Sequence, residues 1–120
     1  NIIQHSLLAG LAHPQLSTVL LAIHNAPERQ WGIEAMAELA LMSRSKFAEL
    51  FKRIVNQSPG DYLIDCRIAV AKDLLQKNKP VALVANAVGY ETGSALARVF
   101  RKKIGLSPKQ WLEKTHRFYS

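Results

Sequence analysis

The chain lacks the residues from which redox, metal and membrane-spanning sites are usually built. Its 120 residues include one cysteine, Cys66, which excludes an internal disulfide and indicates a reducing compartment. The four histidines have no i, i+4 pair and no Cys or carboxylate at ligand spacing, and no glycine-rich phosphate loop is present. The longest apolar stretch, residues 16–23, is too short to cross a bilayer. We therefore expect no catalytic residue and neither a metal ion nor another cofactor.

Positive charge is plentiful, but only in part of the chain. The net charge is +7. Residues 1–42 carry one Lys or Arg against three Asp or Glu, a net of −2, whereas residues 43–120 carry fifteen against six, a net of +9. A basic chain of this size suits nucleic acid, an anionic membrane or an acidic protein. The charge alone favours nucleic acid only modestly and leaves the others open.

The second half of the chain repeats itself. Seven positions recur 49 residues later: Phe47, Leu50, Phe51, Ser58, Pro59, Tyr62 and Leu63 match Leu96, Val99, Phe100, Ser107, Pro108, Trp111 and Leu112. Upstream the offset is 48: Ile33, Met36, Ala37 and Ala40 match Val81, Val84, Ala85 and Val88. The second copy therefore has one extra residue, which inside a helix would turn every later side chain by about 100°. Because a turn absorbs such an insertion, the repeat predicts two copies of helix, turn, helix.

Apolar spacing and the capping residues Ser43, Ser58, Thr92 and Ser107 predict an all-α chain of about seven helices with no strand. The expected helices span residues 16–24, 33–41, 44–56, 59–77, 81–88, 93–104 and 108–112, and residues 115–120 are expected to fray. Residues 2–11 are either a further short helix or a remnant of a connector between domains. We expect four segments: a connector at 1–14, a first helix-turn-helix subdomain at 15–57, a linking helix at 58–78 and a second subdomain at 79–120. Since the chain begins with Asn1 and not Met, we expect a piece of a longer protein.

The second helix of each copy has the outward face expected of a helix that reads a major groove. On a helical wheel the Phe47 side is apolar, and the opposite faces carry Ser45, Ala48, Glu49 and Lys52, then Ser94, Ala97, Arg98 and Arg101. Short residues allow close approach and a few long ones reach base edges. Residues 59–77 would span about 28 Å, near the roughly 34 Å of one DNA turn, so a monomer could reach successive major grooves. The alternatives are solvated amphipathic faces, or a basic helical module that binds an acidic protein.

These motifs resemble one family, the DNA-binding domain of AraC/XylS bacterial transcription regulators. The resemblance covers about residues 15–112, and its motifs are residues 37–43 (AELALMS), 47–52 (FAELFK), 57–63 (QSPGDYL), 67–75 (RIAVAKDLL), 88–91 (VGYE) and 99–108 (VFRKKIGLSP). It implies two helix-turn-helix subdomains joined by a long helix, sequence-specific binding of double-stranded DNA, and usually activation of transcription. It also implies a bacterial cytoplasmic location on the nucleoid, contact with RNA polymerase, and no membrane partner.

The resemblance also places the DNA contacts. The base-contacting positions fall on Ser45, Ala48, Glu49, Gly93, Ser94, Ala95, Ala97 and Arg98. We expect the phosphate contacts at Ser43, Arg44, Lys46, Lys52, Arg53, Ser58, Thr92, Arg101, Lys102 and Ser107. The two alanines of the outward faces offer only apolar contact, for example to a thymine methyl, whereas Glu49 could accept from cytosine N4. Arg98 is the strongest candidate for a base contact, bidentate to guanine, with a phosphate contact as its alternative.

The opening of the chain carries a second resemblance. Residues 7–14 and 22–24 are similar to the junction in longer family members whose N-terminal half is a cupin-like sensor domain. This implies that a small-molecule effector would act only through an upstream domain that is missing here.

Overall fold

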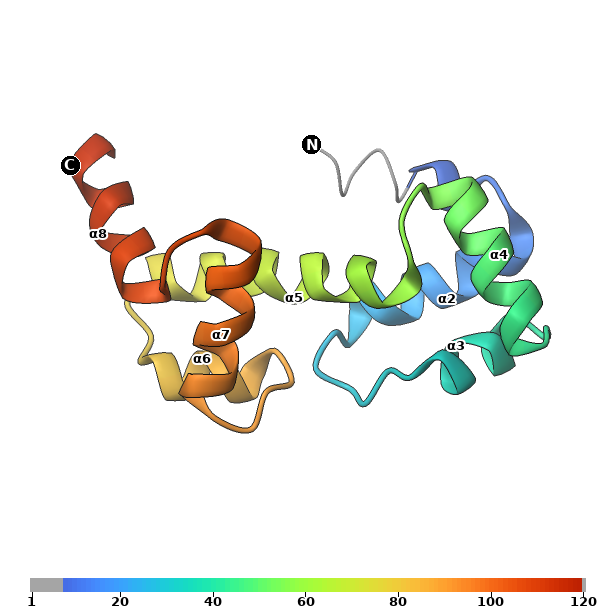
Figure 1. Cartoon of the computed structure of the whole chain (residues 1–120), viewed down its shortest axis with the longest axis horizontal. Helices are drawn as coiled ribbons and strands as arrows, with labels where there is room; N and C mark the ends of the chain where they lie inside the picture. Colours follow the sequence, from blue (N-terminus) through green and yellow to red (C-terminus); the bar gives the residue numbers. More distant parts are fainter. Residues whose placement is uncertain (1–7, 120) are drawn as a thin grey trace. The chain divides into compact units, whose positions relative to one another are not determined.

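The computed structural model describes residues 8–119, with side chains through His116, and this part of the chain is helical with no strand (Figure 1). Its helices are α2 (Pro14–Asn25), α3 (Ile33–Leu39), α4 (Arg44–Val55), α5 (Pro59–Gln76), α6 (Val81–Ala87), α7 (Gly93–Ile104) and α8 (Pro108–Tyr119). Residues 8–11 are also helical, while the remainder of the segment 2–11 lies outside the described residues. The all-α prediction is confirmed.

The chain divides into two compact units, residues 1–66 and 67–120. Each contains one complete helix pair, α3 with α4 in the first unit and α6 with α7 in the second. The boundary falls within α5, which is a single helix of 18 residues. The four-segment division, with α5 as a separate linking segment, stays a prediction.

The turns of the two helix pairs account for the change in repeat offset. Residues 40–43 separate α3 from α4, whereas residues 88–92 separate α6 from α7, so the extra residue lies in the turn, as predicted. Both turns contain a residue in the left-handed region at the same repeat position. It is Gly89 in the second copy, with φ of 100°, and Leu41 in the first, with φ of 58°. Only the second copy therefore uses the residue that tolerates this conformation without steric cost.

Side-chain caps begin four of the helices. The hydroxyl oxygen of Ser43 accepts from Lys46 N at 3.3 Å, and that of Thr92 accepts from Ala95 N at 3.0 Å. Ser58 caps α5 by accepting from Asp61 N at 3.2 Å. These bonds satisfy amide donors that have no partner inside the helix, as the sequence predicted for these three residues.

The cap of α8 is reciprocal. Ser107 Oγ accepts from Gln110 N at 3.2 Å, while Gln110 Oε1 accepts from Ser107 N at 3.0 Å. This helix continues to Tyr119, so the predicted end of the helix at Leu112 was wrong, and residues 115–119, which were expected to fray, are helical. Nothing after Pro108 breaks a helix, because residues 109–119 contain neither glycine nor proline.

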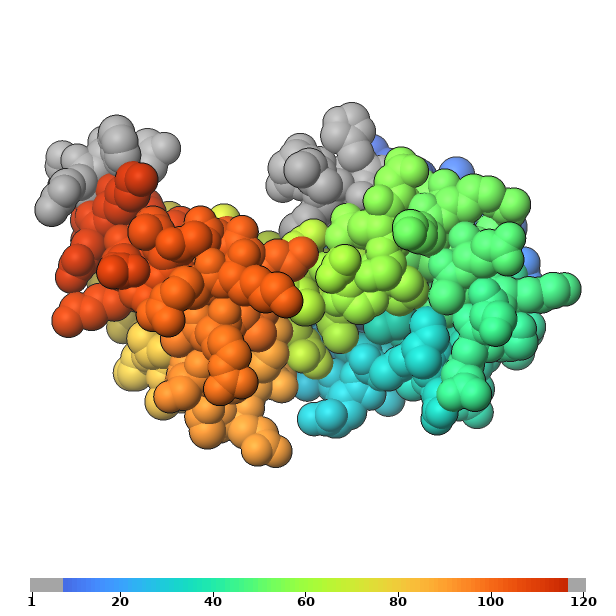
Figure 2. All heavy atoms as spheres, in the orientation of Figure 1, coloured from blue at the N-terminus to red at the C-terminus, as the bar shows by residue number. Residues whose placement is uncertain are grey.

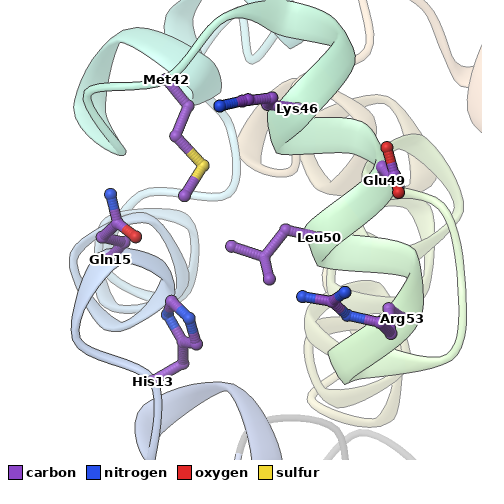
Figure 3. Close-up of a pocket in the computed structure, with 7 residues that line it drawn as sticks. All are labelled: His13, Gln15, Met42, Lys46, Glu49, Leu50 and Arg53. Atoms are coloured by element: carbon purple, nitrogen blue, oxygen red, sulfur yellow. The ribbon is translucent and has the colours of Figure 1, made fainter.

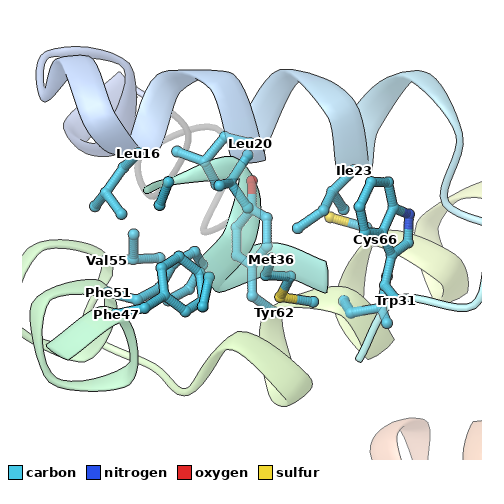
Figure 4. Close-up of a cluster of buried hydrophobic side chains, with 14 residues drawn as sticks. Leu16, Leu20, Ile23, Trp31, Met36, Phe47, Phe51, Val55, Tyr62 and Cys66 are labelled. Atoms are coloured by element: carbon cyan, nitrogen blue, oxygen red, sulfur yellow. The ribbon is translucent and has the colours of Figure 1, made fainter. Parts of the chain in front are cut away.

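The core of the first unit forms where α2, α3 and α4 meet the start of α5 (Figure 4). Phe47 and Phe51 of α4 are fully buried and stack at a tilt, with ring centroids 5.6 Å apart. Tyr62 of α5 packs edge-on against Phe51. Trp31 is buried and donates from Nε1 to Ala26 O at 2.7 Å, so it anchors this core. Each large apolar side chain buried in this way contributes about 1.5–3 kcal/mol.

One end of this core is polar. A hydrogen bond of 2.5 Å joins Tyr62 Oη to His24 Nε2, and Cys66 Sγ lies 3.7 Å from the same nitrogen. Desolvation lowers the pKa of His24 and raises that of Tyr62. Burial also raises the pKa of the Cys66 thiol to about 11. The cysteine is therefore a protonated core residue near neutral pH.

The second unit has its own smaller core. Leu96 and Phe100 of α7 are fully buried, as are Val84 and Ala85 of α6. Trp111 of α8 packs edge-on against Phe100 with centroids 5.8 Å apart, and the Lys72 ammonium lies 5.6 Å from the Trp111 ring. Trp111 is only half-buried, in contrast to Trp31. It therefore covers the edge of this core, and its ring is engaged from two sides.

Candidate nucleic-acid interface

The burial of Phe47 and Phe51 fixes which face of α4 meets solvent. Ser45 and Glu49 are exposed, and Ala48 is half-buried between them. The predicted outward face of the first copy is therefore confirmed as exposed. Figure 2 shows atoms of the α4 segment, in green, at the surface of the first unit. Small residues line this face at the N-terminal end of the helix, and a longer carboxylate follows one turn later.

The outward face of α7 follows the same rule. Buried Leu96 and Phe100 anchor the helix, so that Ser94 and Arg98 are exposed while Ala95 and Ala97 are half-buried. The half-buried Gly93 opens this helix, one residue after the capping Thr92. The structure thus brings the predicted base-contacting positions of each copy together on one helix face.

The candidate phosphate contacts differ in how available their polar groups are. Arg44, Lys46, Lys52 and Arg53 are exposed on α4, as are Arg101 and Lys102 on α7. Ser43, Ser58, Thr92 and Ser107 already accept a helix-capping hydrogen bond. Their hydroxyl hydrogens can still be donated to a phosphate oxygen, because each cap uses only the acceptor side of the hydroxyl.

One of these cations has a partner that the sequence pattern did not indicate. Arg44 Nη1 lies 3.1 Å from Glu34 Oε1, and both side chains remain largely exposed. This pair joins the start of α4 to α3. An exposed ion pair contributes little to stability, so Arg44 can exchange Glu34 for another anion at small cost.

The two outward helices carry most of the local positive charge. Helix α4 has four Lys or Arg and one Glu, a net of +3, and α7 has four Lys or Arg and no acid, a net of +4. Three of the α7 cations lie in its last turn, beside the negative end of the helix dipole. Both faces therefore combine a short polar end with a cationic flank.

A groove that the sequence analysis missed runs along one edge of α4 (Figure 3). Its volume is about 350 Å³, and it is lined by His13, Gln15, Met42, Lys46, Glu49, Leu50 and Arg53. Lys46, Glu49 and Arg53 lie at helical spacing on one stripe of α4. This spacing is the only feature of the sequence from which the α4 side of the groove could have been predicted. The facing His13 and Gln15 come from the start of α2, about thirty residues earlier, and no pattern in the sequence related them to α4.

Other kinds of site find no support in the part of the chain that the structure describes. Within it, no three His, Cys, Asp or Glu side chains gather closely enough to hold a metal ion. None of its helices combines the length and the apolar character needed to cross a bilayer.

Each of the two small helical units presents an exposed second helix, flanked by cations, after a short turn. This arrangement is typical of helix-turn-helix DNA-binding domains. A family model described as "helix-turn-helix domain" matches residues 36–114. The chain belongs to this family, as an AraC-type DNA-binding domain of the kind found in longer bacterial transcription regulators. This confirms the resemblance seen in the sequence.

Individual relatives agree with this assignment. The HTH-type transcriptional regulator AlkR of Acinetobacter baylyi is 40% identical over 111 residues, which is 92% of this chain and 36% of that protein. The crystal structure of the DNA-binding domain of AdpA, a global transcriptional factor, in complex with a target DNA is similar with a TM-score of 0.80 and 27% identity. That match covers 86% of this chain and 94% of the AdpA chain.

A third relative is similar in fold. It is a transcriptional regulator from Chromobacterium violaceum with an AraC-type DNA-binding domain, similar at a TM-score of 0.76 and 21% identity. The match covers 86% of this chain and 93% of the Chromobacterium chain. The chain spans between 34% and 39% of the length of the first curated relatives that it matches.

Proposed function

We propose that this domain binds double-stranded DNA sequence-specifically, with α4 and α7 as its two recognition helices, as the DNA-reading part of a transcription regulator. The observation that carries the proposal is a pair of exposed faces at corresponding repeat positions. They consist of Ser45, Glu49 and Lys52 on α4 and Ser94, Arg98 and Arg101 on α7. The similarity to the AdpA domain, whose structure contains a target DNA, supports the same conclusion.

In this proposal the bases are read mainly by two charged residues. Glu49 accepts a hydrogen bond from cytosine N4, and it repels phosphates when the register is wrong. Arg98 donates to guanine O6 and N7. Ser45 and Ser94 bond to base edges, and Ala48, Ala95 and Ala97 admit the backbone close to the groove floor and contact thymine methyls.

The phosphate contacts position these helices. Lys46, Lys52 and Arg53 neutralise phosphates of the DNA backbone beside α4. Arg44 joins them when it exchanges its ion pair with Glu34 for a phosphate. Arg101 and Lys102 do the same beside α7. The capping hydroxyls of Ser43, Ser58, Thr92 and Ser107 donate to phosphate oxygens. These contacts carry no sequence information, but they set affinity and its salt dependence.

We further propose that the two helices read successive major grooves. The 18 residues of α5 extend about 27 Å at roughly 1.5 Å per residue, which approaches the roughly 34 Å of one helical turn of DNA. A single chain would then recognise two half-sites, a task for which most helix-turn-helix proteins use a dimer. Because Glu49 and Arg98 differ in charge at the same repeat position, the two half-sites should differ in sequence.

In the whole regulator, we propose that this domain activates transcription by contact with RNA polymerase in the bacterial cytoplasm. The effector would act through an upstream domain, which suits a chain that spans little more than a third of its relatives. The connector formed by residues 1–14 would join the two.

Selection of binding sites from random duplexes tests the DNA-reading function directly. The expected result is an asymmetric site with two informative blocks about one helical turn apart, bound on the order of 10³-fold more tightly than random DNA. Steep weakening at higher salt should accompany both specific and random binding. If no sequence is enriched and an acidic protein competes as well as DNA does, the domain is a basic protein-interaction module and the proposal fails.

A further inference from the structure

The groove beside α4 is lined by α4, by the turn before it, which contributes Met42, and by the start of α2, which is no part of the proposed reading surface. Lys46, Leu50 and Arg53 come from α4, whereas His13 and Gln15 come from the start of α2. Figure 3 shows the Lys46 and Arg53 side chains extending toward the groove from one side and the His13 ring facing it from the other. The groove therefore adjoins the reading face and shares Glu49 with it, while its α2 side lies outside that face.

The rim of this groove suits an anion. Lys46 and Arg53 are exposed cations on the α4 side. On the α2 side His13 occupies the N-cap position, but its side chain makes no capping hydrogen bond. The ring is therefore not used to cap α2. The exposed Gln15 adds an amide. Glu49, the acid on this stripe, also lines the groove, so the α4 side carries two cations and one carboxylate.

The middle of the groove is apolar. Met42 and Leu50 are both half-buried, and their side chains lie between the two polar rims (Figure 3). A free phosphate would use only the rims and leave these side chains uncovered. A ligand that fits the whole groove combines an anionic group with a compact, weakly polar body.

We infer that this groove seats one sugar–phosphate unit of the DNA strand that borders the major groove read by α4. The phosphate lies between Lys46, Arg53 and His13, with Gln15 as a further donor, and the deoxyribose covers Met42 and Leu50. A volume of about 350 Å³ that is open to solvent suits a continuous strand that enters and leaves. The inference rests on the proposed DNA-reading function, and it makes the start of α2 a third DNA-contacting element of the first unit.

Two variants with matched controls test the role of α2. His13→Ala removes the ring, and Gln15→Glu places a negative charge at the groove rim. Acid in the first turn favours a helix, so a loss of DNA affinity in Gln15→Glu would not come from unfolding of α2. Gln30→Ala and Gln30→Glu make comparable changes at an exposed loop residue of the same unit, outside the groove.

The measurement is affinity for the selected duplex by fluorescence anisotropy, repeated with duplexes that carry a neutral methylphosphonate at one phosphate at a time beside the first block. We expect His13→Ala and Gln15→Glu to bind roughly two- to fivefold more weakly than wild type, while the Gln30 variants bind like wild type. A methylphosphonate at one or two of these positions should weaken DNA binding by the wild type. The same substitutions should have little further effect on the DNA affinity of His13→Ala.

Three outcomes would overturn the inference. In the first, both α2 variants bind as wild type does. In the second, His13→Ala keeps the full sensitivity to every methylphosphonate. In the third, octanoate titrated without DNA shifts the NMR signals of the Met42 and Leu50 methyl groups while the α2 variants bind DNA normally, which assigns the groove to a small amphipathic anion. A wild-type domain without sequence preference would instead refute the proposed function itself.

Discussion

Glu49 and Arg98 occupy the same position of the repeat, 49 residues apart, and carry opposite charge. Both are exposed on the outward face of their helix. A carboxylate accepts hydrogen bonds from bases, whereas a guanidinium donates two in a fixed geometry, so the pair cannot favour the same base. The duplicated fold therefore supports an asymmetric site through a single pair of residues.

Arg98→Ala should relax specificity at one base pair of the second half-site. The loss of a bidentate contact costs about 1–3 kcal/mol of discrimination at that position. Competition binding against duplexes with each base at each position measures it. Equal losses on all sequences would instead assign Arg98 to a phosphate.

Leu41 is a strained residue that the second copy avoids. It has φ of 58° and is 89% exposed, whereas the corresponding residue is Gly89. Leu41→Gly removes a left-handed conformation that costs a side-chain-bearing residue about 1–2 kcal/mol, partly offset by the greater freedom of glycine in the unfolded chain. We expect a gain of about 0.5–1 kcal/mol by urea denaturation, and a loss for Gly89→Ala at the matching turn. A loss in both variants would show that the exposed Leu41 side chain stabilises the turn.

His24 makes the stability of the first unit depend on pH. Desolvation lowers its pKa below the 6.5 of the unfolded chain, so the unfolded state binds the proton more readily. Stability is therefore complete above about pH 6.5 and falls as the pH drops through that value toward the folded pKa. Thermal melts near pH 7.5 and pH 5 should differ more for wild type than for His24→Gln. An equal difference in both proteins would rule out a contribution from His24.

At the scale of single helices, what matters is how each one begins. Helices α4 and α7 each start with a hydroxyl cap, from Ser43 and Thr92, which leaves their first amides satisfied and their outward faces available. Helix α7 then continues with Gly93, the weakest helix former apart from proline. A Cβ on Gly93 would lie 3.4 Å from Val81 Cγ1, an ordinary contact.

Gly93→Ala should consequently stabilise the second unit. The change adds helix propensity and restricts the unfolded chain, for a gain of about 0.5 kcal/mol. Gly105→Ala is the matched control, because Gly105 has φ of 89° and an added side chain would be strained there. Chemical denaturation of both variants should give shifts of opposite sign. A destabilised Gly93→Ala would mean that Val81 cannot accommodate the methyl group.

At the scale of the whole molecule, the proposed DNA binding depends on positive charges that are spread over both units. Its net charge of +7 is the sum of +9 from residues 43–120, the part that contains both recognition helices, and −2 from residues 1–42. Each phosphate neutralised by a Lys or Arg releases condensed counterions, so the logarithm of affinity falls with the logarithm of salt concentration by about 0.9 per contact. Lys52 and Arg101, 49 residues apart and both exposed, are matched reporters for the two units.

Lys52→Ala and Arg101→Ala should each weaken binding to every sequence and reduce the salt slope by about 1. Titrations at several salt concentrations, with both the selected site and random DNA, measure the slope. Lys79→Ala is the control, because Lys79 is exposed in the loop between α5 and α6 and lies outside the proposed face. Unchanged slopes for both Lys52→Ala and Arg101→Ala would refute the proposed docking face.

Much of this architecture could be predicted from the sequence, because helices, caps and turns depend on residues that are close together in the chain. The apolar period of 3.6 residues, the capping Ser43 and Thr92 and the change of repeat offset predicted the helices, the turns and the outward faces, since each depends on neighbours within one or two helical turns. The same rules failed after residue 112, where the helix persists because no breaker follows.

Only the tertiary structure decided which distant residues meet. Glu34 reaches Arg44 across a turn, Tyr62 meets His24 at the edge of a core, and His13 faces Arg53 across a groove. The chain separation in these pairs ranges from ten to forty residues. No periodic pattern relates such positions, because their contact arises from the packing of one whole helix on another. The sequence by itself determined the two reading helices, and the folded unit determined what lies beside them.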